Sequence, residues 1–327
     1  MKKVLGMGNA LVDILVKIND DVILEKFDLP KGSMQLVDKE KSQQLIQALS
    51  HLKYDVASGG SAANTINGLA NLDIPCGYIG KIHEDSFGGI FTKDMTQKGI
   101  EAILFNGIQD TGIATTLIST DSQRTFATYL GAAVELTPED LKEDYFKGYD
   151  YFHIEGYLVQ NHELIETAVK HAKKCGLKVS IDMASYNVVE GNLAFLTKLV
   201  SEYVDIVFAN EEESKSFTGK NPEEALLHIA EMCEIAVVKV GAKGSMVKTK
   251  SERVHCKAIP ANPVDTTGAG DLFASGFLYG MAHNLSLEQC AKLGSLLAGN
   301  VIEVIGPKMD ENRWSRIRSG VAEIRSV

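Results

Sequence analysis

Short runs of β-branched and apolar residues alternate along the chain with longer stretches in which apolar residues recur every three or four positions. The first pattern is typical of buried strands, and the second is typical of the helices that cover them. The helical spacing is clearest at residues 162–176 and 222–233, and strand-like runs such as KVSIDMA and IAVVKVG follow these stretches. Because strands that alternate with helices pair in parallel, the sequence predicts an α/β fold with helices on both faces of a mostly parallel sheet.

Two segments alternate polar and apolar side chains instead, which is typical of antiparallel strands with one buried face. They are residues 15–39 and 113–131, and the second contains a predicted hairpin turn at 120–123. We expect one domain over residues 1–327, in which these two segments form a small β-sheet that acts as a lid over a substrate. A hairpin with no role in binding is the alternative interpretation.

The charge and hydropathy patterns exclude several classes of partner. A net charge of −10 leaves no basic surface for a nucleic-acid backbone, so we expect no nucleic-acid partner. Asn9, Asp13 and Lys17 interrupt the apolar run near the N-terminus, which we interpret as a buried first strand and not as a secretory signal. No window has the roughly 18 uninterrupted apolar residues of a membrane helix. We therefore expect a cytoplasmic protein without a membrane partner.

The stretch DTTGAGD, which ends at Asp271, is a glycine-rich turn followed by the apolar spacing of a helix. The backbone N–H groups of Gly268, Ala269 and Gly270 would lack partners within that helix and would form an anion site. Asp271 would accept a hydroxyl proton beside this site, an arrangement that suits phosphoryl transfer. We expect the helix dipole to keep Asp271 ionised and Asp265 to hold the turn in place. A helix that is merely capped is the alternative.

A second glycine-rich stretch, SGGSAANTINGLA, also precedes a predicted helix. Gly59 and Gly60 allow the backbone to approach a ligand closely, and Asn64 offers a donor and an acceptor. Asn9 and Asp13, near the end of the first predicted strand, would supply further polar groups. One carboxylate with two amides suits the vicinal diol of ribose or another sugar, although each residue taken alone is more typical of a turn or a cap.

Two further motifs follow predicted strands. In FANEEES, the side-chain oxygens of Asn210 and Glu213 suit Mg²⁺, bound mainly through water, and a glutamate-rich helix start is the alternative. In KVGAKGS, Gly241 and Gly244 form a turn that would cover nucleotide phosphates. The chain has no GxxxxGK[ST] pattern, which disfavours a P-loop NTPase.

The segments GGSAANTINGLANLDIPCGYIGKIHEDSFGG and DTTGAGDLFASGFLYG resemble the two signatures of the PfkB, or ribokinase-like, carbohydrate kinase family. The resemblance spans essentially the whole chain and implies a ribokinase-like α/β/α core under a β lid, with ATP along one edge of the core. It implies that Asp271 is the catalytic base and that the GAG turn is the anion hole. Within the family, GNALVDI, KGSMQLVD, QRTFATYLGAA, EGYL and FANEEE are most similar to segments of the adenosine kinases and their bacterial relatives.

The resemblance also implies binding roles, position by position. The sugar hydroxyls would be held by Asn9, Asp13, Gly60 and Asn64, and Gln35 from the lid would cap the ligand. The nucleotide would lie on Gly241, Lys243 and Gly244 and on the adenine edge at Ser295 and Gly299, with Mg²⁺ organised by Asn210 and Glu213. The family is often activated by K⁺, and the positions that match its cation site are Asp265, Thr267, Val301, Val304 and Gly306.

These observations predict an ATP-dependent kinase that phosphorylates the 5′-hydroxyl of a nucleoside, adenosine first. A sugar kinase of the ribokinase or fructokinase type is the alternative, and a ligand-binding protein without catalysis is disfavoured because the base and the anion hole are both present. We interpret Arg124 as an exposed hairpin arginine and assign no role to Lys239. A monomer, or a homodimer formed through the edges of the lid, is expected.

Overall fold

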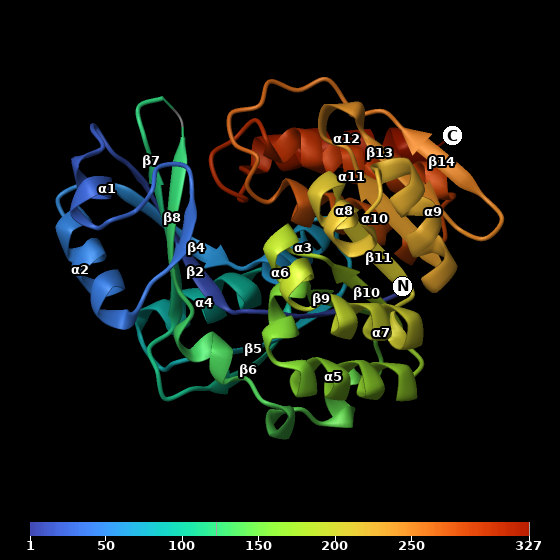
Figure 1. Ribbon diagram of the computed structural model, residues 1–327, viewed down its shortest axis with the longest axis horizontal. Coiled ribbons are helices and arrows are strands. Elements are labelled where there is room, and N and C mark those ends of the chain that lie inside the picture. The colour runs from blue at the N-terminus through green and yellow to red at the C-terminus, as the bar shows by residue number, and fades with distance from the viewer. Residues whose placement is uncertain (122, 327) are drawn as a thin grey trace.

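The computed structural model describes residues 1–121 and 123–326, and in this part of the chain the largest element is a sheet of nine strands (Figure 1). Their spatial order is β14-β13-β12-β11-β10-β9-β1-β5-β6. The strands are β1 (Val4–Met7), β5 (Cys76–Ile82), β6 (Glu101–Asn106), β9 (Tyr151–Glu155), β10 (Lys178–Asp182), β11 (Ile206–Asn210), β12 (Ile235–Lys239), β13 (Ser245–Lys248) and β14 (Arg253–Cys256). All pairs from β6 to β12 are parallel and the last two are antiparallel, so the predicted mostly parallel sheet is confirmed.

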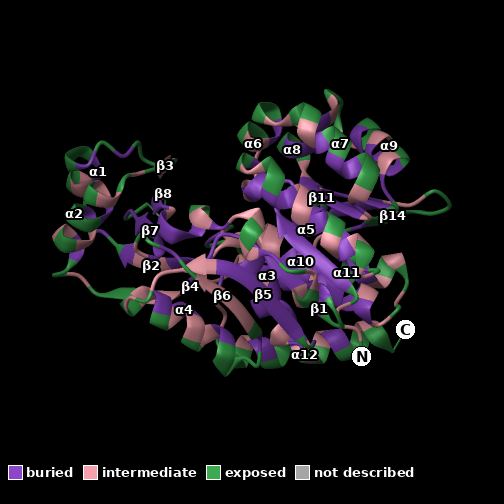
Figure 2. Cartoon of the chain, turned by 90° about the horizontal axis from the view of Figure 1, so that it is seen from below, coloured by how far each residue is buried: buried purple, intermediate pink, exposed green. Residues whose placement is uncertain are grey.

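Helices cover both faces of this sheet, because strand residues point alternately to one face and to the other. On β11, Phe208 packs on one side and Val207 and Ala209 on the other. The first side holds α3 (Ser61–Ala70), α4 (Ser86–Gln97), α10 (Ala269–Ala282), α11 (Leu287–Val301) and α12 (Glu311–Arg325). The second holds α5 (His162–Lys174), α6 (Tyr186–Gly191), α7 (Leu193–Tyr203), α8 (Glu211–Thr218) and α9 (Pro222–Met232). Figure 2 shows the central strands buried between these two layers, which matches the predicted three-layer core.

A second, five-stranded sheet stands beside the core (Figure 1), in the order β3-β8-β7-β2-β4. Its strands are β2 (Leu11–Lys17), β3 (Met34–Leu36), β4 (Tyr54–Gly59), β7 (Gly112–Ile118) and β8 (Arg124–Tyr129). The helices α1 (Val22–Lys26) and α2 (Lys39–Leu49) pack on one face of it through Leu24, Leu45 and Leu49. The other face borders the cavity described below.

The small sheet differs from its predicted extent in two places. Residues 15–39 were expected to be antiparallel strands, but they hold the end of β2, the helix α1, the first residue of α2 and the three-residue β3, which pairs in parallel with β8. The alternating pattern of residues 22–26 is satisfied by one helical turn that buries Leu24. Strand β4 was missed because its first residues are exposed and its last are small. The expected antiparallel pair is present as β7 and β8, and the predicted turn at 120–123 includes residue 122, which lies outside the described residues.

The predicted single first strand is two strands. After β1, the chain leaves the large sheet at Gly8 and enters the small one at Leu11, so Asn9 lies at the junction of the two sheets. In the described ranges, no helix combines the length and the apolar character needed to cross a membrane.

Candidate active site

A cavity of about 2270 Å³ lies between the carboxyl ends of the central strands, the small sheet and the start of α10. It is lined by most of the predicted site residues: Asn9, Asp13, Gln35, Gly60, Asn64, Asn210, Glu213, Gly241, Gly244, Thr267, Gly268, Ala269, Gly270, Asp271, Ser295 and Gly299. Six predicted residues do not line it: Gly59, Lys243, Asp265, Val301, Val304 and Gly306. Parallel strands place their carboxyl ends at one edge, which explains why residues far apart in the sequence meet here.

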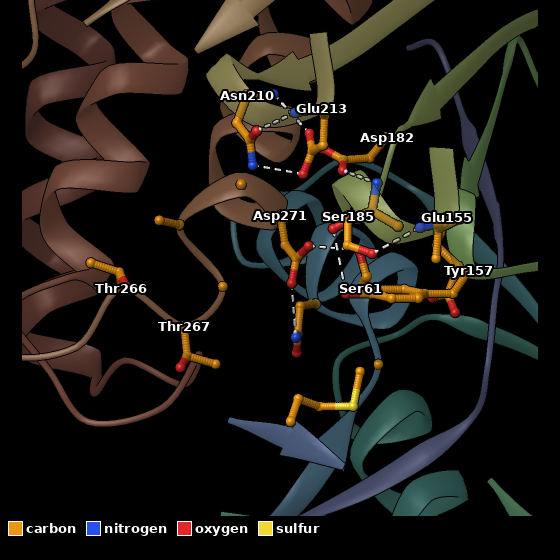
Figure 3. A pocket seen from close by; sticks show the side chains of 18 of the residues that line it. Ser61, Glu155, Tyr157, Asp182, Ser185, Asn210, Glu213, Thr266, Thr267 and Asp271 are labelled. Carbon is orange, nitrogen blue, oxygen red and sulfur yellow. Dashed lines mark hydrogen bonds between the residues drawn. The ribbon is translucent and has the colours of Figure 1, made fainter. Parts of the chain in front are cut away.

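Asp271 lies in the first turn of α10, in the middle of the cavity wall (Figure 3). Its carboxylate accepts hydrogen bonds from Ser61 Oγ at 2.7 Å and from Asn64 Nδ2 at 3.1 Å. Burial raises the pKa of Asp271 to about 6, and the hydrogen bond from Ser61 opposes this rise. Burial thus acts against the helix dipole, which by itself favours the ionised carboxylate. The carboxylate is still mostly ionised at pH 7, and it is a stronger base than an exposed aspartate.

The turn before α10 has the geometry of an anion site. Gly268 has φ of 75°, a conformation that glycine adopts without strain, and an added Cβ would lie 2.7 Å from Pro307 Cβ. Ala269 N–H already donates to Thr266 O at 3.2 Å. Within the described residues, the N–H groups of Gly268, Gly270 and Asp271 make no such bond, so these three, and not Ala269 N–H, are free to bind an anion.

Glu155, at the end of β9, organises the junction between the two sheets, and the sequence reasoning missed it. Its buried carboxylate accepts hydrogen bonds from Asn9 N at 2.9 Å, from Asn9 Nδ2 at 2.7 Å and from Ala62 N at 2.9 Å. Burial raises the pKa of Glu155 to about 7. Glu155 thus fixes both Asn9 and the start of α3, which carries Asn64. A glutamate at the end of an otherwise apolar strand-like run was the available signal.

Asp13 lies on β2 and faces the same part of the cavity from the small sheet. Burial raises the pKa of its carboxyl group, and the nearby ammonium of Lys308 opposes this. Gly59 pairs with Leu11 across β4 and β2, and any side chain at Gly59 would collide with the Asp13 carboxylate. Gly59 therefore makes room for Asp13, although it does not line the cavity itself.

Asn210 and Glu213 form a reciprocal cap at the start of α8. Asn210 N and Nδ2 each donate to the Glu213 carboxylate at 2.7 Å, and Glu213 N donates to Asn210 Oδ1 at 2.8 Å. Burial raises the pKa of Glu213 above its ordinary value. Both side chains stand near Asp182 at the edge of the cavity (Figure 3). Oxygen donors of this kind fit Mg²⁺, and since their atoms already bond to each other, the fit is to an ion that retains water.

Asp182 and Lys239 form an ion pair that the sequence did not reveal. Lys239 Nζ lies 2.8 Å from Asp182 Oδ2, and both residues line the cavity. Burial alone would lower the pKa of Lys239, but the attraction of Asp182 and Glu213 outweighs it and holds the pKa above its usual value. The ammonium group is therefore charged at neutral pH.

Arg124 is not the exposed hairpin residue that the sequence suggests. Its side chain, on β8, is only 13% exposed, and Nη1 lies 2.6 Å from the buried Asp265 Oδ1. Arg124 Nη2 also donates to Val264 O at 2.7 Å. Asp265 in addition accepts the N–H groups of Thr267 and Gly306, which confirms that it holds the turn in place. Arg124 thus ties the small sheet to the segment that leads into α10.

Comparisons with known proteins agree over most of the chain. Residues 33–312 match the sequence profile described as pfkB family carbohydrate kinase. A probable sugar kinase protein from Rhizobium etli is 38% identical, with a TM-score of 0.87 and coverage of 98% of this chain and 99% of that one. The adenosine kinase from Sinorhizobium meliloti is 35% identical, with the same TM-score and coverage. The 5-dehydro-2-deoxygluconokinase of Bacillus subtilis is 28% identical over 300 residues, which cover 87% of this chain and 91% of that protein.

Proposed function

This chain belongs to the pfkB family of carbohydrate kinases, and we propose that within this family it transfers the γ-phosphoryl group of ATP to the 5′-hydroxyl of a nucleoside, adenosine first. The chain is a kinase, as the matched family and its named relatives are. The choice of a nucleoside is supported by the similarity to the Sinorhizobium meliloti adenosine kinase over 98% of the chain. It is supported independently by the character of the cavity wall.

The main structural support for a nucleoside acceptor is the apolar wall that the small sheet gives to the cavity. Met34 and Leu36 on β3 are 49% and 58% exposed, and both line the cavity. Phe126 on β8 is the register partner of Met34 and lines the cavity too. A free sugar carries hydroxyl groups around its ring and has only small C–H faces, whereas a purine has a broad apolar ring that such side chains can cover. The wall lies on the same sheet as Asp13, so base and ribose would bind side by side.

The charge of the cavity disfavours an acidic sugar as the acceptor. A gluconate carries a carboxylate and requires a cationic partner when it is buried. Among the described residues that line the cavity, Lys239 is the single lysine or arginine, and it lies at the α10 end. Asp13 and Glu155 line the end where the acceptor would bind. A neutral sugar, of the ribokinase or fructokinase type, is the second candidate, favoured by the similarity to the probable sugar kinase from Rhizobium etli.

The proposed reaction uses the site residues as follows. Asp13, Asn64 and Asn9 hold the ribose diol, and Gln35 borders the ligand from β3. Asp271 accepts the proton of the attacking hydroxyl, while the N–H groups of the turn bind the phosphoryl oxygens. ATP lies along Gly241, Gly244, Ser295 and Gly299. Mg²⁺, when bound near Asn210 and Glu213, supplies positive charge to the phosphates.

We propose K⁺ only as an activator, bound next to the turn that precedes α10 and outside the reaction itself. The carboxylate of Asp265 already forms an ion pair with Arg124 and accepts hydrogen bonds from two backbone N–H groups. A monovalent cation at Thr267, Val301, Val304 and Gly306 would therefore be held mainly by main-chain oxygens. The permanent guanidinium beside Asp265 leads us to expect a modest dependence on K⁺.

The test is a panel of acceptors measured at saturating ATP and Mg²⁺: adenosine, inosine, ribose, fructose and 5-dehydro-2-deoxygluconate. We expect kcat/KM for adenosine to exceed that for each free sugar at least tenfold. The variant Phe126→Ala should raise KM for adenosine severalfold and leave KM for ATP unchanged. A free sugar that outperforms adenosine tenfold would reject the nucleoside and favour the second candidate.

A further inference from the structure

Lys239 and Asp182 occupy equivalent places on two strands of the large sheet. Each is the last residue of its strand, β12 and β10, and β11 lies between them. Their side chains are 15% and 8% exposed, and the 2.8 Å contact between them lies at the carboxyl edge of the sheet. The pair therefore stands inside the cavity and not on the outer surface.

The ammonium group of Lys239 lies directly beside the turn that begins α10. A Cβ placed on Gly270 would be 3.0 Å from Lys239 Nζ and 3.9 Å from Asp182 Oδ2. Gly270 is thus the residue whose missing side chain leaves the ammonium group open to the turn. Asp182 is the one hydrogen-bond acceptor of Lys239 Nζ among the described residues. Since an ammonium group has three N–H bonds, two remain available to a ligand at this point.

The charges around the cavity make this single cation important. Of the residues that the structure describes, eight acidic ones line the cavity: Asp13, Glu155, Glu163, Asp182, Glu211, Glu212, Glu213 and Asp271. Lys239 is the one lysine or arginine among the described lining residues. A phosphoryl group that entered an acidic cavity without a cation at the point of transfer would be repelled. Backbone N–H groups and a metal ion reduce this repulsion, and Lys239 is placed to reduce it on the side of Gly270.

We propose that Lys239 is a catalytic residue whose ammonium group binds the phosphoryl group as it moves across the turn, and that Asp182 is a positioning residue that aims it. In the transfer, the bond from the γ-phosphorus to the ADP oxygen breaks and a bond to the acceptor oxygen forms, while the hydroxyl proton passes to Asp271. The equatorial oxygens carry the charge throughout, and Lys239 contacts these oxygens. The proposal rests on the proposed place of transfer beside Asp271, but not on the identity of the acceptor.

The experiment compares Lys239→Met and Lys239→Arg with Lys250→Met, an exposed lysine outside the cavity. Each is assayed with the best acceptor of the panel. We expect Lys239→Met to lower kcat roughly 10²-fold, with KM for the acceptor within about threefold of wild type, because the contact forms during transfer. The kcat of Lys239→Arg should be at least tenfold higher than that of Lys239→Met. The kcat of Lys250→Met should equal that of the wild type. Asp182→Asn should lower kcat less than Lys239→Met, because it leaves the ammonium group in place but less well aimed.

A kcat for Lys239→Met within threefold of wild type would overturn the proposal. If Lys239→Met does not fold, the same comparison is made between Lys239→Arg and Lys239→Gln, and equal kcat values for these two would also overturn it. Asp271→Asn, measured in parallel, separates this failure from that of the proposed function. If Asp271→Asn is inactive and Lys239→Met is active, only the catalytic role of Lys239 is rejected. If both variants are active, the proposed place of phosphoryl transfer beside Asp271 is rejected as well.

Discussion

Ser61 Oγ donates a hydrogen bond of 2.7 Å to Asp271 Oδ1, which joins the first residue of α3 to the first turn of α10. A second bond between the helices runs from Thr65 Oγ1 to Asp271 O at 3.1 Å. The two glycine-rich stretches are thus parts of one site, because the helices that follow them pack side by side. The position of the base depends on this packing as much as on the turn itself.

Ser61→Ala should shift the acidic limb of the pH profile of kcat/KM to higher pH. The hydrogen bond from Ser61 favours the ionised form of Asp271, so without it the pKa of the carboxyl group rises further above about 6. We expect a displacement of roughly one pH unit. The measurement is kcat/KM between pH 5 and 8.5, with the exposed Ser319→Ala as control. An acidic limb at the same pH as in the wild type, or at lower pH, would show that Ser61 does not favour the ionised form of Asp271.

Asp271→Asn should abolish most of the activity while leaving the site formed. An amide cannot accept the hydroxyl proton, so kcat should fall by ~10²–10⁴, with acceptor binding largely retained. Steady-state kinetics and titration calorimetry measure the two quantities. Binding without turnover in the wild type, across Mg²⁺ and K⁺ conditions, would instead favour a ligand-binding protein.

The same variant should be more stable than the wild type at neutral pH. The pKa of Asp271 is raised from 3.8 to about 6 in the folded state, so folding favours the protonated form. This contribution to stability is fully present below pH 3.8 and is lost as the pH rises through 6. Asp271→Asn removes the cost of the buried charge, and we expect the free energy of unfolding at pH 7 to rise by roughly 1–3 kcal/mol. Urea unfolding at pH 7 and pH 4 checks this, because the gain should vanish at the lower pH.

Arg124→Met should lower the stability of the folded protein and make its stability and activity more dependent on K⁺. The substitution leaves the Asp265 carboxylate, which is 1% exposed, without its ion-pair partner, at a cost of about 3–5 kcal/mol. A monovalent cation near Asp265 would restore part of this loss. Melting temperatures and kcat are compared in KCl and in tetramethylammonium chloride at equal ionic strength. An identical response of the variant and the wild type to K⁺ would argue against a cation site at Asp265.

The large sheet was predictable because its signals are local. Strands such as β11 and β12 contain continuous apolar runs, and helices such as α5 and α9 show their apolar spacing within a few turns. The small sheet was harder to predict because β3 has three residues and β4 is half exposed. Such strands acquire their conformation from their neighbours and not from their own sequence.

The sequence by itself determined the α/β architecture, the two glycine-rich turns and the aspartate that follows the second one, since each depends on residues adjacent in the chain. Only the tertiary structure placed Lys239 against Gly270, Glu155 beneath Asn9 and Arg124 on Asp265. These contacts join strands and helices that are distant in sequence, and strand order and register decide which side chains meet. The burial that raises the pKa of Asp271 has the same origin, because no local pattern specifies how much protein surrounds a carboxyl group.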